Sequence, residues 1–286
     1  MKRQHGSFSL IGLVATLGLC LVVGTAGADD IAWDMVDSDS HNLVSYSTDA
    51  PVFNNPGDGF QKYAAVQQVC PPVPDPNLNN IPWSLVDDSV CIYPEDSGGI
   101  IDTMTDFDEF FGVTDTENDD NSGPVSATWV FNISSAVDNL ELHVDLAAMG
   151  NYEDPEDSFV WTYQVDAGAV ETFLTAVADE DGMLTYTMAD GTTRDLDDPL
   201  VVNGTTLTNH FQTFSTSIPA GSQLTVVLTA VTDGGYEGYA VRDILVTDFD
   251  PAQGGGQPIP TLSMAGIAAM ALLLMAAGMV LFRRLR

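Results

Sequence analysis

Positive charge is scarce in this sequence. Its 286 residues include 8 lysines and arginines against 41 aspartates and glutamates. Five basic residues lie at the two ends, and all 41 acidic residues lie between Asp29 and Asp250, where the only basic residues are Lys62, Arg194 and Arg242. This field repels phosphates and anionic lipid, which excludes nucleic acid as a partner, and it attracts cations. A solvated acidic surface, as in proteins adapted to high salt, is the alternative interpretation.

Common catalytic motifs are also missing. The sequence has no Gly-x-Ser-x-Gly, no His-Glu-x-x-His and no phosphate-binding loop. His143 lies between Glu141 and Asp145 on one face of an expected strand, where a solvated role is more common than that of a base. We therefore expect no enzyme activity. A hydrolase with paired carboxylates is the alternative, although pairs arise by chance among 41 acids.

The N-terminal residues resemble a secretory signal peptide. Lys2 and Arg3 precede an apolar run over 10–23, and Ala26-Gly27-Ala28 forms a small-x-small cleavage site. Residues 1–28 are thus predicted to be removed by signal peptidase; an uncleaved anchor is the alternative. A lipoprotein cysteine at Cys20 is disfavoured, because Leu19 stands where a small residue is needed.

The C-terminal residues have the pattern of a membrane anchor. Residues 263–282 are almost wholly apolar, and about 19 helical residues at about 1.5 Å each cover the hydrocarbon layer. The basic tail 283–286 should remain in the cytoplasm, which places the preceding chain outside. We expect an exported protein that passes through a single-pass inner-membrane intermediate to the cell surface.

Cysteine is rare as well. After cleavage only Cys70 and Cys91 remain, and export to an oxidising compartment predicts a disulfide between them. It would close a proline-rich loop of about 20 residues and contribute about 3 kcal/mol in the chain-entropy model. Two free thiols or a metal pair are the alternatives.

Period-two alternation of apolar and polar residues dominates the region 29–250. Leu140, Leu142, Val144 and Leu146, for example, define one apolar face of a strand. Turn signals such as Asp-Gly and Asn-Gly separate many such segments, which predicts one all-β sandwich or barrel. A split near Gly98-Gly99 is the alternative, and 105–111 could form one helical turn. The expected strands are 31–36, 43–47, 63–69, 90–93, 128–133, 140–146, 159–165, 172–177, 184–188, 211–217, 224–230 and 239–246.

A flexible, glycine-rich linker over 251–262 precedes the apolar segment. It contains Ile259, Pro260, Thr261 and Leu262, followed by Ser263. This motif, directly before a spanning helix and a basic end, resembles the IPTL-CTERM sorting signals of Gram-negative surface proteins. The resemblance implies an exosortase-like processing enzyme as a partner. The Glu-Trp-Gly that usually follows is here Met264-Ala265-Gly266, and a chance motif before an ordinary anchor is the alternative.

Residues 235–246 resemble the closing strand of galactose-binding-like jelly rolls, and residues 153–157 resemble an acidic turn of those domains. The resemblance implies an antiparallel jelly-roll-like sandwich. Arg242 stands where an aspartate is common in these families, and it could form an ion pair with Asp243 or Glu237.

Calcium is the best chemical hypothesis, because it binds six to eight oxygens that acidic loops can supply. One candidate site combines Glu153, Asp157 and Asp243. A second lies in the segment 115–121 and uses Asp115, Glu117 and Asp119.

Exposed aromatic residues near loops could stack on sugars, although core packing is the commoner role; the candidates are Trp83, Tyr93 and Tyr236. We therefore expect a surface or extracellular-matrix protein that binds a glycan or matrix ligand. A purely structural surface-layer or biofilm component is the alternative.

Overall fold

A computed structural model describes residues 28–64, 81–87, 89–91, 98–136 and 140–248. The predicted signal peptide (apart from Ala28), linker, sorting motif and membrane segment lie outside these residues, as do Cys70 and the side chain of Cys91. Within the described part, no helix has the length and apolar character needed to cross a membrane. The protein forms the following strands there: β1 (Asp29–Val36), β2 (Asp39–His41), β3 (Leu43–Thr48), β4 (Gly59–Tyr63), β5 (Phe110–Thr114), β6 (Val125–Asn132), β7 (Leu140–Met149), β8 (Ser158–Val165), β9 (Glu171–Ala178), β10 (Met183–Thr187), β11 (Thr193–Asp197), β12 (Leu200–Val202), β13 (Thr205–Thr206), β14 (Gln212–Ile218), β15 (Gln223–Val231) and β16 (Gly238–Asp248).

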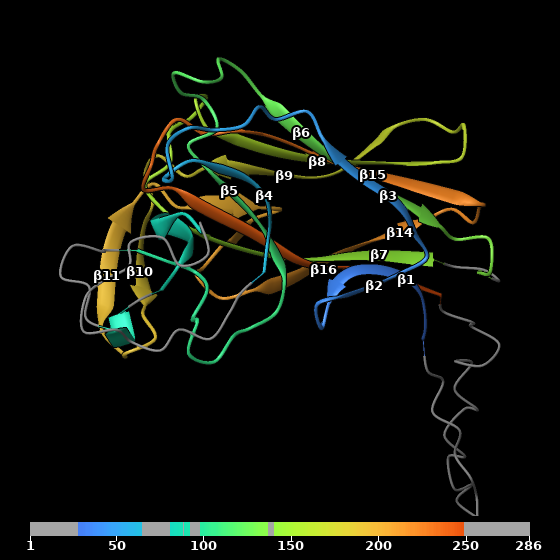
Figure 1. The fold of residues 1–286 in the computed structure, drawn as a ribbon, viewed down its shortest axis with the longest axis horizontal. Coiled ribbons are helices and arrows are strands. Elements are labelled where there is room, and N and C mark those ends of the chain that lie inside the picture. Colours follow the sequence, from blue (N-terminus) through green and yellow to red (C-terminus); the bar gives the residue numbers. More distant parts are fainter. Residues whose placement is uncertain (1–27, 65–80, 88, 92–97, 137–139, 249–286) are drawn as a thin grey trace, which may run out of the picture.

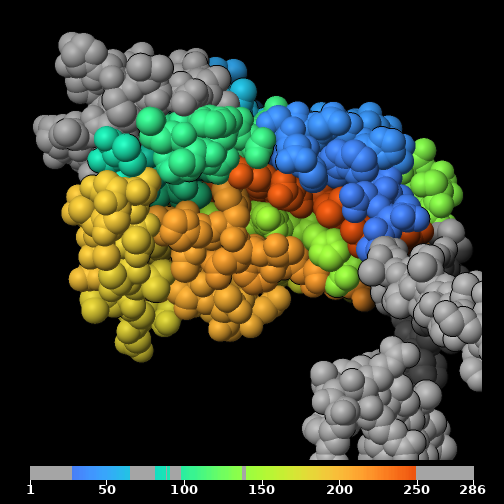
Figure 2. Space-filling view, turned by 90° about the horizontal axis from the view of Figure 1, so that it is seen from below, coloured from blue at the N-terminus to red at the C-terminus, as the bar shows by residue number. Residues whose placement is uncertain are grey.

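Fourteen of the strands form two antiparallel sheets that pack face to face, and β10 and β11 form a separate two-stranded sheet (Figure 1). The first sheet runs β14-β7-β16-β1-β2, and β5, itself paired with β4, continues along the same edge of β16 as β1. The second sheet runs β13-β12-β9-β8-β15-β6-β3. This all-β sandwich confirms the predicted fold class. Figure 2, seen from below, shows β1, β16, β7 and β14 side by side on the outer face of the first sheet.

The main core lies between the two sheets. Alternate residues of β6, β7 and β15 are buried because successive side chains of a strand point to opposite faces. At its centre Trp129 and Trp161 stack with ring centroids 5.8 Å apart. The hairpin of β10 and β11 covers a smaller core with η2 (Trp83–Leu85) at one end of the sandwich.

Three expected elements differ in the structure. The helical turn over 105–111 is wrong, because Phe110 and Phe111 begin β5, whose five residues are all buried and show no alternation. The strand expected from Tyr63 instead ends there as β4, and 65–69 lies outside the described residues. Ser89–Cys91 forms a short 3-10 helix (η3) where a strand was predicted from Val90 onward.

Candidate metal centre

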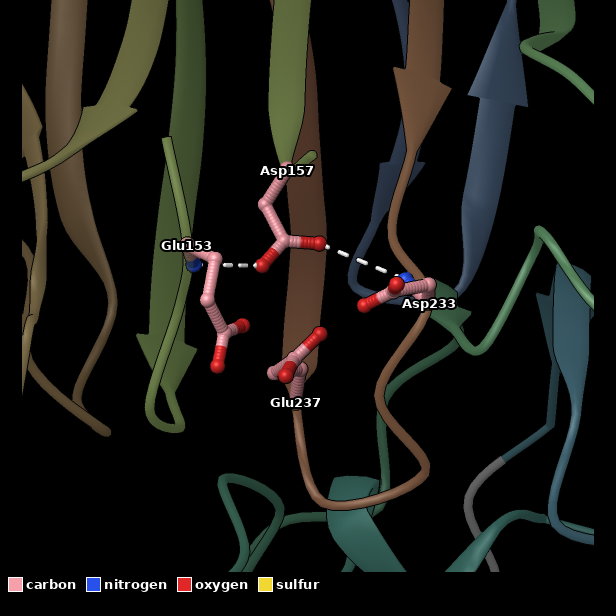
Figure 3. Close-up of side chains that lie close together, drawn as sticks. All are labelled: Glu153, Asp157, Asp233 and Glu237. Atoms are coloured by element: carbon pink, nitrogen blue, oxygen red, sulfur yellow. Dashed lines mark hydrogen bonds between the residues drawn. The ribbon is translucent and has the colours of Figure 1, made fainter. Parts of the chain in front are cut away.

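Two loops meet at one end of the second sheet. The β7–β8 loop carries Glu153 and Asp157, and the β15–β16 loop carries Asp233 and Glu237. Strands β8 and β15 are neighbours, and Ser158 pairs with Val231, so the start of β8 lies beside the end of β15. The four carboxylates consequently converge from segments about 80 residues apart (Figure 3).

The spacing of these side chains fits a calcium ion. One carboxylate oxygen from each residue lies within 4.8 Å of the corresponding oxygens of the other three. Two ligands on opposite sides of a calcium ion at about 2.3–2.6 Å are about 4.6–5.2 Å apart. One ion can therefore contact all four carboxylates with little rearrangement.

Two of the four acids are deeply buried. Asp157 is 1% exposed and Glu237 6% exposed, whereas Glu153 and Asp233 reach solvent. Burial, together with the charges of Asp157 and Glu153, raises the pKa of Glu237 to about 8 despite a hydrogen bond from Thr232. Burial also raises the pKa of Asp157 and of Glu153. The fold thus holds these acids where their ionised forms need a compensating charge.

Two of the three lysines and arginines of the described chain form ion pairs elsewhere, and the third, Arg194, lies exposed on β11. Lys62 contacts Asp34 and Glu109, and Arg242 contacts Asp106. Among the ion pairs of the described residues, none includes a member of the four-carboxylate cluster. A bound cation or a proton is therefore the remaining way to neutralise Asp157 and Glu237.

Backbone hydrogen bonds hold the two loops in place. The amide of Glu153 donates to Asp157 Oδ2 at 2.8 Å, and the amide of Asp233 donates to Asp157 Oδ1 at 3.3 Å (Figure 3). Gly234 donates its amide to Glu237 Oε2 at 3.0 Å, and a Cβ at Gly234 would lie 1.9 Å from the other oxygen of that carboxylate. The glycine is therefore what lets the Glu237 carboxylate turn back over its own loop.

The structure brings together only two of the three residues of the first predicted calcium site. Glu153 and Asp157 do come together, but the other two members of the cluster are Asp233 and Glu237. Asp243 lies on β16, and the charges that shift its pKa are those of Asp145, Arg242, Asp108 and Asp37. Arg242 does not take Asp243 or Glu237 as its ion-pair partner. Its guanidinium donates to both oxygens of Asp106 at 2.7 Å and stacks on Phe211.

The second predicted site is also rearranged. Asp115 faces Asp58, a residue that the sequence analysis did not consider, while Glu117 and Asp119 are exposed. The amide of Glu117 bonds to the carbonyl of Thr232, which ties this segment to the β15–β16 loop. Acidic residues in one turn thus point apart, and the contacts form between turns.

Other residues singled out by sequence lie at the surface. Tyr236, between Asp233 and Glu237, is 77% exposed, and Trp83 is 48% exposed. Tyr93 lies outside the described residues. His143 is on the outer face of the first sheet, as expected, and its Nε2 lies 3.1 Å from Thr247 Oγ1. The sequence analysis did not place Asp233 and Glu237 in a candidate site, although their i, i+4 spacing repeats that of Glu153 and Asp157.

Comparison with known proteins adds little to this geometry. No protein-family pattern matches the chain, and no curated protein matches its sequence. The K3 adhesin domain of Lys-gingipain from Porphyromonas gingivalis aligns with a TM-score of 0.27 and 12% identity, over 54% of this chain and 81% of that domain. The CBM22-1 xylan-binding domain from Paenibacillus barcinonensis Xyn10C aligns with a TM-score of 0.19 and 9% identity, over 48% of this chain and 80% of that domain.

Proposed function

We propose that this chain is an exported, calcium-supported surface protein that binds a glycan or matrix ligand at the loops around Glu237. The observation that carries the proposal is the four-carboxylate cluster, in which two buried acids have no cationic partner among the described residues. Calcium would be held by Glu153, Asp157, Asp233 and Glu237. Its role there is to neutralise the buried charge and to fix two loops relative to each other.

The ligand site is proposed beside this cation. Tyr236 belongs to the loop that supplies Asp233 and Glu237, so fixing these carboxylates also fixes the tyrosine. The carbonyl of Ser84 lies against Gly238, which brings η2 and its exposed Trp83 to the same end of the molecule. Exposed aromatic rings provide flat apolar surfaces that suit the ring faces of sugars. An uncharged glycan also avoids the repulsion that this acidic protein exerts on anions.

Export and sorting are part of the same proposal. The first strand, β1, begins at Asp29, the residue after the proposed cleavage position. We assign the sandwich to the jelly-roll type because β6, β7 and β8, and likewise β14, β15 and β16, alternate between the two sheets. The apolar segment would hold the chain in the inner membrane until an exosortase-like enzyme cuts near Thr261–Leu262.

Intact mass measurement on protein from washed membranes and from the medium tests delivery. A released form that begins at Asp29, ends near Leu262 and is two hydrogens short would support export, sorting and the Cys70–Cys91 disulfide together. A membrane form that retains Arg286 and has no released counterpart would mean a permanent anchor and would remove the sorting proposal.

Thermal unfolding with calcium and with chelator tests the cation. A ligand that binds only the folded state stabilises it by about 2.7 kcal/mol at 100 times its Kd, which is about 5–10 °C for a domain of this size. We expect that increment in the wild type and its loss in Glu237→Gln. The matched control is Glu156→Gln, which neutralises an exposed acid of the same β7–β8 loop outside the cluster. An equal calcium response in wild type and Glu237→Gln would rule out the proposed site.

A glycan array probed with the purified ectodomain (residues 29–250) tests the ligand. Binding should require calcium and should be lost in Tyr236→Ala, while the calcium-induced rise in melting temperature persists in that variant. Val52→Ala, a change at another highly exposed position, is the control. A calcium response without binding to any glycan would favour the structural surface-layer alternative.

A further inference from the structure

Asp58 and Asp115 are brought face to face by strand pairing. In the antiparallel pair of β4 and β5, Gly59 lies opposite Thr114. The residues that follow outward from this pair are Asp58 and Asp115, so the register places two like charges opposite each other. Such pairs destabilise a sheet unless something neutralises them.

The Asp58 carboxylate is enclosed and only half satisfied. Asp58 is 8% exposed, and its Oδ2 accepts a hydrogen bond from the Asn118 amide at 2.9 Å. Its Oδ1 is buried and has no hydrogen-bond partner among the described residues. The carboxyl group of Asp58 instead contacts that of Asp115, which supplies no proton when both are ionised.

We propose that Asp58 and Asp115 bind a second divalent cation, with calcium as the best match to an all-oxygen site. The free Oδ1 of Asp58 and the Asp115 carboxylate would be the protein ligands, and water would complete the coordination sphere. Asp120 is not a ligand in this proposal, because its two oxygens accept hydrogen bonds from the side chain and the backbone amide of Asn54, each at 2.7 Å.

A shared proton is the competing way to relieve the contact. Burial, the Asp115 charge and contact, and the Asp120 charge raise the pKa of Asp58 to about 6. Above that pH a proton is mostly lost, whereas a divalent cation is bound more tightly as its ligands ionise. The two explanations differ in stoichiometry, because a cation in this site adds one bound ion per chain and a shared proton adds none.

The second site borders the loop that supplies the first. Thr232 donates its amide to Thr116 Oγ1 at 3.0 Å, and a Cβ at Gly235 would lie 3.7 Å from Asp115 Oδ2. Asp233 acts electrostatically on Asp115 as well as on Glu153 and Asp157. Two cations would thus fix the β15–β16 loop, with Tyr236, from both sides.

Native mass spectrometry and calorimetry with calcium at pH 7.5 test this inference on the full chain after signal-peptide cleavage. We expect two ions per chain in the wild type, one in Asp58→Asn and one in Glu237→Gln, with none in the double variant. Asp119→Asn, an exposed acid in the same turn as Asp115, should retain two ions.

Each other outcome identifies the part that fails. If the wild type binds one ion, and Glu237→Gln abolishes that binding while Asp58→Asn does not, the second site is overturned and the first is kept. If Asp58→Asn abolishes it and Glu237→Gln does not, the first site is overturned and the second is kept. If the wild type binds no ion, both sites are overturned. Melting in chelator controls for folding: Asp58→Asn should melt at least as high as wild type, because it removes a repulsion. A lower melting temperature together with two bound ions would reduce Asp58 to a structural hydrogen-bond acceptor.

Discussion

Charge repulsion at a single buried aspartate, Asp243, should make the stability of this protein depend on pH. Asp243 lies in a β-bulge of β16 with a φ of 51°, in the left-handed region that aspartate and asparagine tolerate best among side chains with a Cβ. Burial raises its pKa to about 6, and Asp145, Asp108 and Asp37 add to the shift while Arg242 opposes it. A folded-state pKa above the unfolded value means that stability falls as the pH rises through about 6.

Asp243→Asn should therefore stabilise the protein above pH 6. We expect a gain of about 1–2 kcal/mol in the free energy of unfolding at pH 7.5, less than the full pKa shift because the group is partly solvated. The gain should shrink as the pH falls towards 4, because the folded-state carboxyl is then protonated while the unfolded-state carboxyl is losing its charge. Urea unfolding from pH 4 to 8 measures it, with Asp119→Asn as the control. A constant difference at every pH would attribute the effect to backbone preference rather than to charge.

A buried ion pair connects strands β1 and β4. Lys62 on β4 places its Nζ 2.6–2.7 Å from both carboxylate oxygens of Asp34 on β1, and Asp34 is 1% exposed. The Lys62 ammonium also lies 4.9 Å from the centre of the Tyr46 ring on β3. Although β1 and β4 are not hydrogen-bonded to each other, this cation links them within the first sheet and contacts the edge of the second.

Lys62→Met should cost about 3–5 kcal/mol of stability, because it leaves a buried carboxylate without its partner. Adding Asp34→Asn should recover much of that loss, since the amide carries no charge. Chemical unfolding followed by tryptophan fluorescence measures both. Arg194→Met, on the exposed face of β11, is the control and should change stability by less than about 0.5 kcal/mol. If Lys62→Met left the free energy of unfolding unchanged, burial of the Asp34 carboxylate would not require the Lys62 charge.

The net charge of the region 29–250 should lower its stability. Three basic residues against 41 acidic ones create a self-repulsion that acts on every packed state. In chelator at pH 7.5, we expect the melting temperature to rise with sodium chloride and to level off near 1 M, where the Debye length is about 3 Å. Tetramethylammonium chloride at equal ionic strength is the control for specific sodium binding. A melting temperature that does not change with either salt would show that the acidic residues are already neutralised.

The strands could be read from the sequence wherever one face of a strand is buried and the other is wet. Period-two alternation located β6, β7, β8, β14, β15 and β16 within a few residues. It missed β5, because Phe110 to Thr114 are all buried and leave no alternation to detect, and it also missed the short strands β2, β11, β12 and β13. The acidic, all-β character was equally visible, because composition and periodicity are local properties of the chain.

The candidate site depended on contacts that local patterns do not encode. Glu153 and Asp157 were recognisable as neighbours along the chain, but Asp233 and Glu237 join them only because β8 pairs with β15. In the same way, Asp58 meets Asp115 through the register of β4 and β5, not through spacing along the chain. The partners of a carboxylate depend on which loops lie close together in space. Strand pairing and register in the folded sheets determine that proximity.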